Sequence, residues 1–465
     1  MIRFLNVYYP TRTLVLLVCE ALLVSGAFLL ATAYLMGPDT YIALVYENGF
    51  LKIAGITILT LLLSYYFDLY EPQRISGRWE IYFRLLLLLS VLSFLLAGLV
   101  YFFPELDIGV LPETDVGRNV LVTGVSILAI ALVIWRWFYA WTINLSVFRE
   151  RVYVLGGGER ARKVVETLST RRDAGMEVVA GSVEAAAGGE LERFAADLRA
   201  FCKPKLQIER VIVAMEDRRK SMPVRELLDL RLRGVVIEDA GAVMERLLGK
   251  LPLDGLNPSS LIFTQGFNVK ASQQILRRLV SITVSFIGLA VCLPFIPFII
   301  LAVRLSSPGS IFFRQTRVGL RGRPFSVIKF RTMRQDAEAQ GAVWASRNDP
   351  RVTTLGRFMR KTRIDEIPQL WNVLRGEMGF VGPRPERPEF VQWLSNEIPF
   401  YELRHMIRPG ITGWAQVRYQ YGASLEETKQ KLEYDLYYIK HLSLGLDLLI
   451  MFETIKTIVL RRGAQ

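Results

Sequence analysis

Long apolar runs dominate the first third of the chain. They span Leu14–Leu35, Phe50–Phe67, Leu85–Phe103 and Val120–Ile134. A bilayer core takes about 20 apolar residues of helix, so the first three runs have spanning length. The fourth reaches that length only if the aromatic segment 135–141 continues it as an interfacial belt. The pattern predicts four transmembrane helices within residues 1–145.

The loops between these runs alternate in charge. Arginines precede the first run and follow the second and fourth, namely Arg3, Arg12, Arg74, Arg78, Arg84, Arg136, Arg149 and Arg151. Acids fill the loops after the first and third, namely Asp39, Glu47, Glu105, Asp107, Glu113 and Asp115. Since positive loops stay in the cytoplasm, both ends of this region are expected there. Glu20 lies inside the first run and is costly unless it faces a partner helix, so we expect a structural role.

Segment 151–245 alternates strands and helices, as is typical of a small parallel sheet. The predicted strands are RVYVL, EVVAGSV, RVIVAM and VVIEDA. Gly156, Gly158 and Ala161 fit the dinucleotide pattern G-x-G-x-x-G/A after the first strand. The acid expected further on has no clear candidate, since Glu177 begins its strand. This Rossmann-like domain, placed at 146–268, either binds a nucleotide or uses the glycines for close packing.

A fifth apolar run, Leu279–Val303, contains Pro294 and Pro297, which should kink a helix. Basic residues flank both ends, namely Lys270, Arg277 and Arg278 before it and Arg304, Arg314, Arg317, Arg321 and Arg323 after it. A straight span would place one cluster outside the cytoplasm, against the positive-inside rule. A helix that enters, bends and returns keeps both inside, so we favour a re-entrant helix over a plain span.

Composition narrows the class of protein. Hydrophobic residues make up 51% of the chain, which fits a membrane protein, and the net charge is +13. Cytoplasmic loops explain that excess, as does attraction to anionic lipids and phosphorylated substrates. No nucleic-acid-binding module is recognisable. Three scattered cysteines, Cys19, Cys202 and Cys292, and two histidines argue against a disulfide framework or a histidine metal cluster.

The segment Arg314–Met333 is rich in arginine and glycine and ends in a strand-like stretch, FSVIKF. It follows the fifth apolar run directly. Lys329 and Arg331 bracket Phe330 and could cradle a phosphate, although a solvated basic loop would have the same composition.

Two adjacent acids, Asp365 and Glu366, follow a basic stretch and precede Pro368. Pro368 suits the first turn of a helix, where acids are common for electrostatic reasons alone. In a field of arginines both acids would stay ionised, so that one could ligate Mg²⁺ while the other acts as nucleophile. Two arginine-bearing Pro-Gly turns, GFVGPRPE and RPGITGWAQV, follow and fit the binding of a diphosphate.

Five segments occur together and in this order: FFRQTRVG, KFRTM, DEIPQLWNVLRGEM, VGPRP and RPGITGWAQV. In combination they resemble the bacterial sugar transferase family, the monotopic polyprenyl-phosphate sugar-1-phosphate transferases. The resemblance covers residues 270–460, and the preceding part looks like that of the large members. YQYGAS and YDLYYIK look like the branch linked to exopolysaccharide systems.

The resemblance implies a membrane protein with α-helical and α/β parts. It would have four transmembrane helices, a Rossmann-like cytoplasmic domain, and a mainly helical catalytic domain at 269–465 with a re-entrant membrane helix at 279–303. A UDP-sugar would give its sugar-1-phosphate to undecaprenyl phosphate and release UMP through a covalent aspartyl-phosphosugar. The chain would lie in the bacterial inner membrane with its catalytic domain on the cytoplasmic face.

The resemblance also implies residue roles. Asp365 maps to the nucleophile and Glu366 to a Mg²⁺ ligand, and substrate binding is expected of Lys329, Arg331, Arg360, Arg384, Glu386 and Arg408. Arg363-Ile364 and Gly379 replace residues commoner in the family, which leaves the sugar and the nucleotide open.

Two other interpretations remain. One is a membrane-bound nucleotide-sugar reductase or dehydratase using the Rossmann-like domain, against which the absent Y-x-x-x-K pair argues. The other is a membrane scaffold that senses a nucleotide. Whether the chain forms a homodimer also stays open.

Overall fold

The computed structural model describes residues 2–4, 6–71, 78–102, 115–143, 149–181, 208–215, 222–254, 256, 261, 266–267, 270–334, 349–419 and 424–459. The loop acids between 103 and 114, as well as Arg74 and Cys202, lie outside these residues. The chain divides into two compact units. One comprises residues 9–238, and the other comprises 239–465 together with residues 3–8.

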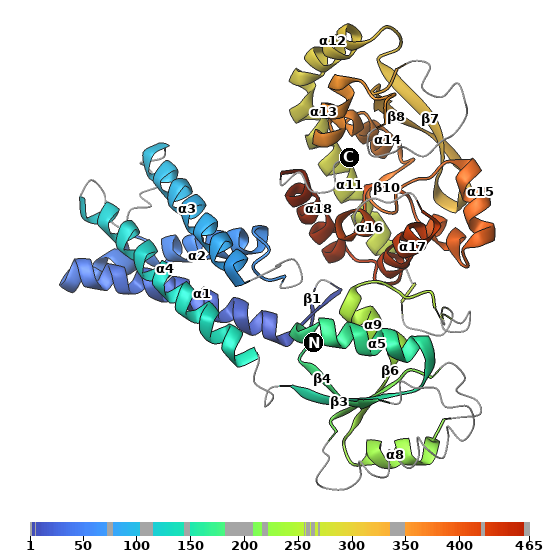
Figure 1. Cartoon of the computed structure of the whole chain (residues 1–465). Coiled ribbons are helices and arrows are strands. Elements are labelled where there is room, and N and C mark those ends of the chain that lie inside the picture. Colours follow the sequence, from blue (N-terminus) through green and yellow to red (C-terminus); the bar gives the residue numbers. More distant parts are fainter. Residues whose placement is uncertain are drawn as a thin grey trace. The chain divides into compact units, whose positions relative to one another are not determined.

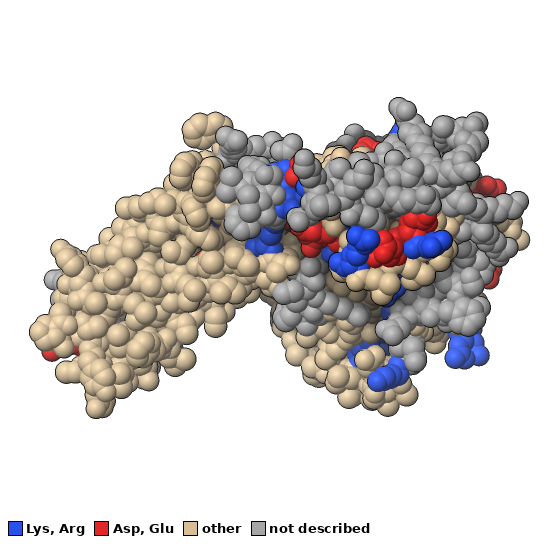
Figure 2. All heavy atoms as spheres, turned by 90° about the horizontal axis from the view of Figure 1, so that it is seen from below, with Lys and Arg blue, Asp and Glu red and all other residues tan. Residues whose placement is uncertain are grey.

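Four long helices form the membrane part of the first unit: α1 (Thr11–Met36), α2 (Gly49–Tyr66), α3 (Arg78–Phe102) and α4 (Asp115–Ile143) (Figure 1). They coincide with the four predicted apolar runs. Buried side chains such as Phe28, Leu88 and Leu128 join them in one core. The outer surface of these helices is almost free of charged side chains on the face seen in Figure 2. Such a surface suits lipid rather than water, so the chain is a membrane protein.

A buried polar network links α1 to α4. The carboxylate of Glu20 on α1 pairs with Arg136 on α4 at 2.7 Å and accepts a hydrogen bond of 2.6 Å from the hydroxyl of Tyr70. Arg136 also donates to the carbonyl of Leu69 at 2.7 Å. Glu20 therefore faces a partner helix, as its cost in an apolar run requires.

The rest of the first unit is a four-stranded sheet in the order β4-β3-β5-β6. Its elements are β3 (Glu150–Leu155), α5 (Gly158–Thr170), β4 (Met176–Gly181), β5 (Arg210–Val213), α8 (Val224–Leu232) and β6 (Val236–Asp239). β3 pairs in parallel with both β4 and β5. The predicted small parallel sheet is confirmed.

The glycine turn after β3 serves close packing. Gly156 has φ +141°, and a Cβ there would lie 2.7 Å from the backbone of Ala214, just after β5. Only glycine fits this approach. The packing alternative thus accounts for Gly156, while nucleotide binding by this domain stays a prediction.

The second unit is mainly helical and carries two small sheets. β7 (Phe312–Val318) and β8 (Pro324–Phe330) form an antiparallel hairpin, and β9 (Gly379–Val381) pairs in parallel with β10 (Gly410–Thr412). Its helices are α9 (Ala240–Leu248), α11 (Ala271–Cys292), α12 (Ile296–Ser306), α13 (Thr354–Thr362), α14 (Gln369–Arg375), α15 (Pro388–Glu397), α16 (Trp414–Arg418), α17 (Leu425–Lys440) and α18 (Leu444–Val459).

The fifth apolar run forms α11 and α12, which are separated by a 3₁₀ turn, Leu293–Phe295, at the predicted prolines. Large apolar side chains along it are exposed, including Phe286 at 65% and Phe298 at 72%. Soluble proteins rarely expose so continuous an apolar surface, which indicates contact with lipid.

Both ends of this apolar segment are fastened to the same unit. On α11, Arg277 pairs with Asp447 at 2.6 Å, and Arg278 donates to the carbonyl of Val373 at 2.6 Å, at the C-terminal end of α14. On α12, Val303 packs against Phe330 in a buried cluster. Both ends of the segment are therefore held by the same folded unit.

The Gly-Pro-Arg-Pro turn after β9 is tied down along its backbone. Three consecutive carbonyls accept hydrogen bonds from outside the turn: that of Arg384 from Arg404 at 2.9 Å, that of Pro385 from Arg317 at 3.1 Å, and that of Glu386 from the amide of Val318 at 2.9 Å. Such anchoring restricts how the Arg384 side chain is presented.

Arg404, which anchors this turn, is itself buried and held by two groups. Its guanidinium pairs with Asp435 on α17 at 2.9 Å and donates to the Tyr401 hydroxyl at 2.7 Å. Burial raises the pKa of Asp435 to about 6, despite the opposing attraction of Arg404. The turn thus depends on an ion pair whose acid titrates in mildly acidic solution.

This raised pKa predicts a pH dependence of stability. Asp435 binds its proton more tightly in the folded chain than in the unfolded chain. The stabilisation that results is fully present below the unfolded pKa, near 4, and is lost as the pH rises through the folded pKa, about 6. The stability of Asp435→Asn relative to the unchanged chain should therefore rise between pH 4 and 7, measured as Tm of the full chain in detergent. The exposed control Glu389→Gln should show no such trend, and a flat or falling difference for Asp435→Asn would contradict the assignment.

The ion pair between Glu20 and Arg136 predicts that the losses of stability caused by substituting the two residues do not add up. Glu20→Leu leaves Arg136 buried without its partner and should cost about 3–5 kcal/mol of stability. The double variant Glu20→Leu/Arg136→Met should recover most of that loss, because no unpaired charge remains. Thermal unfolding in detergent measures both; additive losses would show that the two residues do not act as a pair.

Candidate active site

The acid pair lies in a short 3₁₀ helix, η9 (Ile364–Glu366), between α13 and α14. α13 begins with Thr353, whose hydroxyl accepts from the amide of Gly356 at 2.9 Å. Gly356 packs so closely on the strand segment after β8 that a Cβ would lie 2.1 Å from the carbonyl oxygen of Thr332. This contact fixes α13, and with it the acid pair, against the β7–β8 hairpin.

Arg363 reverses the chain just before the acids. It has φ +58°, a left-handed conformation uncommon for a residue with a side chain, and it ends α13. Its guanidinium turns back to pair with Glu366 at 3.2 Å. Arg363, which stands where the family more commonly has another residue, thus both ends α13 and pairs with Glu366.

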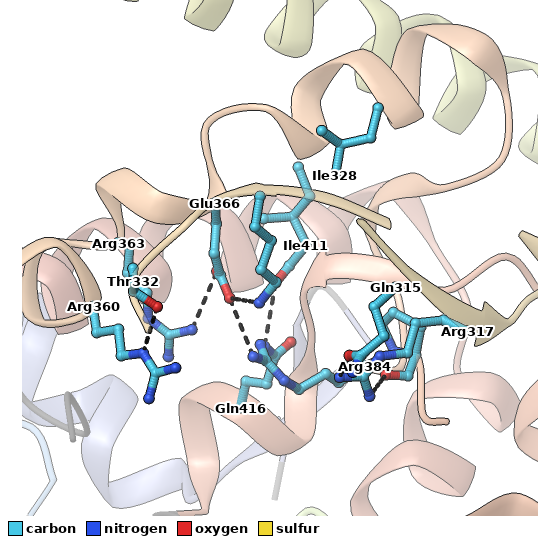
Figure 3. A network of polar contacts seen from close by, with 12 residues as sticks. Gln315, Arg317, Ile328, Thr332, Arg360, Arg363, Glu366, Arg384, Ile411 and Gln416 are labelled. Carbon is cyan, nitrogen blue, oxygen red and sulfur yellow. Dashed lines mark hydrogen bonds and ion pairs between the residues drawn. The ribbon is translucent and has the colours of Figure 1, made fainter. Parts of the chain in front are cut away.

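Glu366 forms ion pairs with three cations, of which Figure 3 labels Arg363 and Arg384. Its Oε1 lies 3.1 Å from Lys329 Nζ on β8 and 3.1 Å from a nitrogen of Arg384 in the Gly-Pro turn, while Arg363 contacts Oε2. Burial alone would raise the pKa of Glu366, but Lys329, Arg384 and Arg363 together hold it far below its usual range. Glu366 is ionised at every physiological pH.

Asp365 differs from its neighbour. It is buried, and within the described part of the chain its Oδ1 has no hydrogen-bond partner. Burial raises its pKa, the charge of Glu366 adds to this, and Lys329 and Arg360 oppose it. A carboxylate oxygen that is neither solvated nor paired is a reactive one, which suits a nucleophile.

Two other predicted residues lie on α13 and directly after β8. Arg360 on α13 donates to the Thr332 hydroxyl at 3.0 Å (Figure 3). Its charge also lowers the pKa of Asp365. Arg331 follows β8 and donates to the carbonyl of Ser307 at 2.5 Å. Arg360 thus acts on the acid pair, whereas Arg331 contacts the residue that ends the apolar segment.

The remaining two predicted residues point elsewhere. Glu386 faces Arg317 at 3.5 Å, and Arg408 donates to the carbonyl of Gly376 at 3.1 Å, beyond the end of α14. Neither contacts an acid of the pair. Their roles in substrate binding stay predictions.

Two supporting residues were not singled out in the sequence. The sequence marks Arg363 as part of the basic stretch before the acids and as a departure from the family pattern, but it does not predict the ion pair with Glu366. Asn372, fully buried on α14, accepts from the amide of Ile328 at 3.1 Å and donates to the carbonyl of Ser326 at 2.8 Å. It joins α14 to β8, which carries Lys329. In the sequence, Asn372 could have been recognised as a polar residue on the inner face of a short apolar helix, where a side chain needs hydrogen-bond partners.

The site has limited means to hold a metal ion. Among the described residues, no group of three or more His, Cys, Asp or Glu side chains could do so. Mg²⁺, however, is usually held by one or two carboxylates together with substrate phosphates and water. Glu366 Oε2, whose one ion partner among the described residues is Arg363, fits that mode.

Comparison with known proteins places this site in a family. The model of the family described as bacterial sugar transferase matches residues 272–461, which contain the acid pair and its three cations. The chain is 43% identical over 223 residues to UDP-N-acetylgalactosamine-undecaprenyl-phosphate N-acetylgalactosaminephosphotransferase of Aeromonas hydrophila, covering 48% of this chain and about half, 52%, of that protein.

Other relatives match over more of their length. The chain is 33% identical over 322 residues to UDP-glucose:undecaprenyl-phosphate glucose-1-phosphate transferase of Escherichia coli (strain K12), covering 68% of this chain and 69% of that protein. It is 39% identical over 220 residues to a protein of the same name in Caulobacter vibrioides, covering 46% of this chain and 82% of that one. The chain therefore belongs to the bacterial sugar transferase family.

Proposed function

We propose that this chain transfers a sugar-1-phosphate from a UDP-sugar to undecaprenyl phosphate and releases UMP. The observation that supports this most is the buried carboxylate of Asp365, whose Oδ1 has no hydrogen-bond partner among the described residues, beside Glu366, which three cations hold ionised. The names of the three relatives indicate the substrates, because each name combines a UDP-sugar with undecaprenyl phosphate. They name different sugars, so the sugar itself stays open.

The proposed reaction has two displacements at one phosphorus atom. An oxygen of Asp365 attacks the phosphorus that bears the sugar, and the bond to the bridging oxygen breaks with its electron pair leaving on UMP. An oxygen of the lipid phosphate then attacks the same phosphorus and expels the Asp365 carboxylate. The products are UMP and a lipid diphosphate sugar, and the carboxylate is regenerated.

The surrounding cations fit the charge of the donor. Lys329 and Arg384 share one oxygen of Glu366 and thus stand together, where a diphosphate would contact both. The anchored Gly-Pro turn keeps Arg384 in place, so little reorganisation is needed during the reaction. Arg360 acts on Asp365 from the other side and would help to keep the attacking carboxylate ionised.

We propose Mg²⁺ as the cofactor, with Glu366 as its protein ligand. When bound, it would neutralise charge on the donor diphosphate. We propose no second protein ligand for the ion.

The apolar segment explains how a lipid acceptor reaches the acids. We propose that α11 and α12 form a re-entrant helix that dips into the cytoplasmic face of the bacterial inner membrane, because both ends are fastened to one folded unit. The phosphate of the acceptor would stay at headgroup level, next to the acid pair. A water-poor site there limits hydrolysis of the intermediate.

The nucleophile assignment predicts the effect of Asp365→Asn. An amide oxygen is a poor nucleophile, so UMP release from the active UDP-sugar should fall at least about 10³-fold, on the order expected for removal of a covalent catalyst. A screen of UDP-sugars in membranes with undecaprenyl phosphate identifies that donor first. Glu389→Gln, which alters an exposed acid, should leave turnover unchanged. Turnover retained by Asp365→Asn would refute its role.

The re-entrant topology predicts where introduced cysteines are labelled. In a background with serine at Cys19, Cys202 and Cys292, cysteines at Lys270 and Arg321 should both resist a membrane-impermeant maleimide in intact cells, because both ends are cytoplasmic. A cysteine at Glu47, in the loop after α1, should react and serves as control. Labelling at Arg321 with protection at Lys270 would indicate a straight span instead.

A further inference from the structure

Arg331 lies where the apolar segment rejoins the folded unit. Its backbone amide donates to the carbonyl of Ile311 at 2.9 Å, which continues the β7–β8 pairing by one residue. Its side chain is buried, with 8% exposed, and donates to the carbonyl of Ser307, the residue directly after α12. The guanidinium therefore sits at the membrane-proximal end of the strand that carries Lys329.

The guanidinium of Arg331 lacks an anionic partner. Among the described residues, no carboxylate lies within ion-pair distance of it, and its Nε and one terminal nitrogen have no hydrogen-bond partner. Lys329, two residues earlier, contacts Glu366 instead. A buried charge without a counter-ion is costly, and a phosphate is the ligand that a guanidinium fork fits best.

The neighbours of Arg331 connect it to the acid pair. Thr332, the next residue, accepts a hydrogen bond from Arg360, whose charge acts on Asp365. Phe330, the preceding residue, shares a buried cluster with Val303 of α12, against which Ile364 also packs. Arg331 thus contacts the end of the apolar segment, and its neighbour Thr332 is tied through Arg360 to the acid pair. It is separate from the three cations that contact Glu366.

We propose that Arg331 binds the phosphate monoester of the lipid acceptor, while Lys329 and Arg384 face the donor diphosphate. The inference rests on the proposed function, which requires two phosphate-bearing substrates to reach one carboxylate in turn. The donor arrives from water and the acceptor from lipid. A cation at the end of the membrane segment is placed for the second of these, and it would hold the phosphate whose oxygen attacks the aspartyl-phosphosugar.

The two displacements allow the two phosphates to be tested separately. Without acceptor, the full chain should release about one UMP per active site in a burst, which reports donor binding and attack by Asp365. With undecaprenyl phosphate in proteoliposomes, steady turnover reports the acceptor. Arg331→Gln should leave the burst within about twofold of the unchanged chain and raise the apparent KM for undecaprenyl phosphate about tenfold or more, as expected for a lost charge-assisted hydrogen bond.

Two further variants serve as controls for Arg331→Gln. Arg331→Lys, which keeps the charge, should raise that KM less than Arg331→Gln does. Arg334→Gln, which removes an exposed cation three residues further on, should change neither quantity. An unchanged acceptor KM in Arg331→Gln overturns the proposal, and so does a burst that falls together with turnover in both Arg331 variants, because donor binding or folding is then affected. If the unchanged chain gives no UMP with any UDP-sugar, the proposed function fails instead.

Discussion

The ionised carboxylate of Glu366 is the constraint on which the catalytic unit depends. Its three cations come from three separate places: Lys329 from β8, Arg363 from the turn that ends α13, and Arg384 from the turn after β9. Burying this carboxylate would be prohibitive without them, because an unpaired buried charge costs several kcal/mol. The same pairing gathers positive charge beside Asp365, so one electrostatic arrangement both stabilises the fold and provides the cations that the proposed donor diphosphate requires.

The second constraint is the attachment of the apolar segment. Arg277 anchors its beginning to α18 through Asp447, and Val303 anchors its end to the strand that carries Lys329. Because Arg278 also caps α14, the helix that follows the acid pair, the position of the membrane segment and that of the acids are mechanically linked. A family that joins a water-soluble donor to a lipid acceptor needs such a link, since the two substrates approach from different phases.

Much of this arrangement can be predicted from the sequence, where the signal is local. Long apolar runs gave α1 to α4, and the alternation of strands and helices gave the parallel sheet around β3. Pro294 and Pro297 predicted the break between α11 and α12. The contacts of single side chains could not be predicted in this way. The left-handed turn at Arg363 and the engagement of Arg408 with Gly376 depend on tertiary packing between segments far apart in the chain.

In the proposed reaction, Asp365 carries the sugar phosphate between donor and acceptor. Incubation of the full chain with its UDP-sugar in the absence of lipid acceptor, followed by proteolysis and mass spectrometry of the peptide that contains Asp365, detects this intermediate. We expect a mass increase equal to one sugar phosphate, located on Asp365 and lost when undecaprenyl phosphate is added. UMP release without an adduct on Asp365, or with an adduct on another residue, would contradict it.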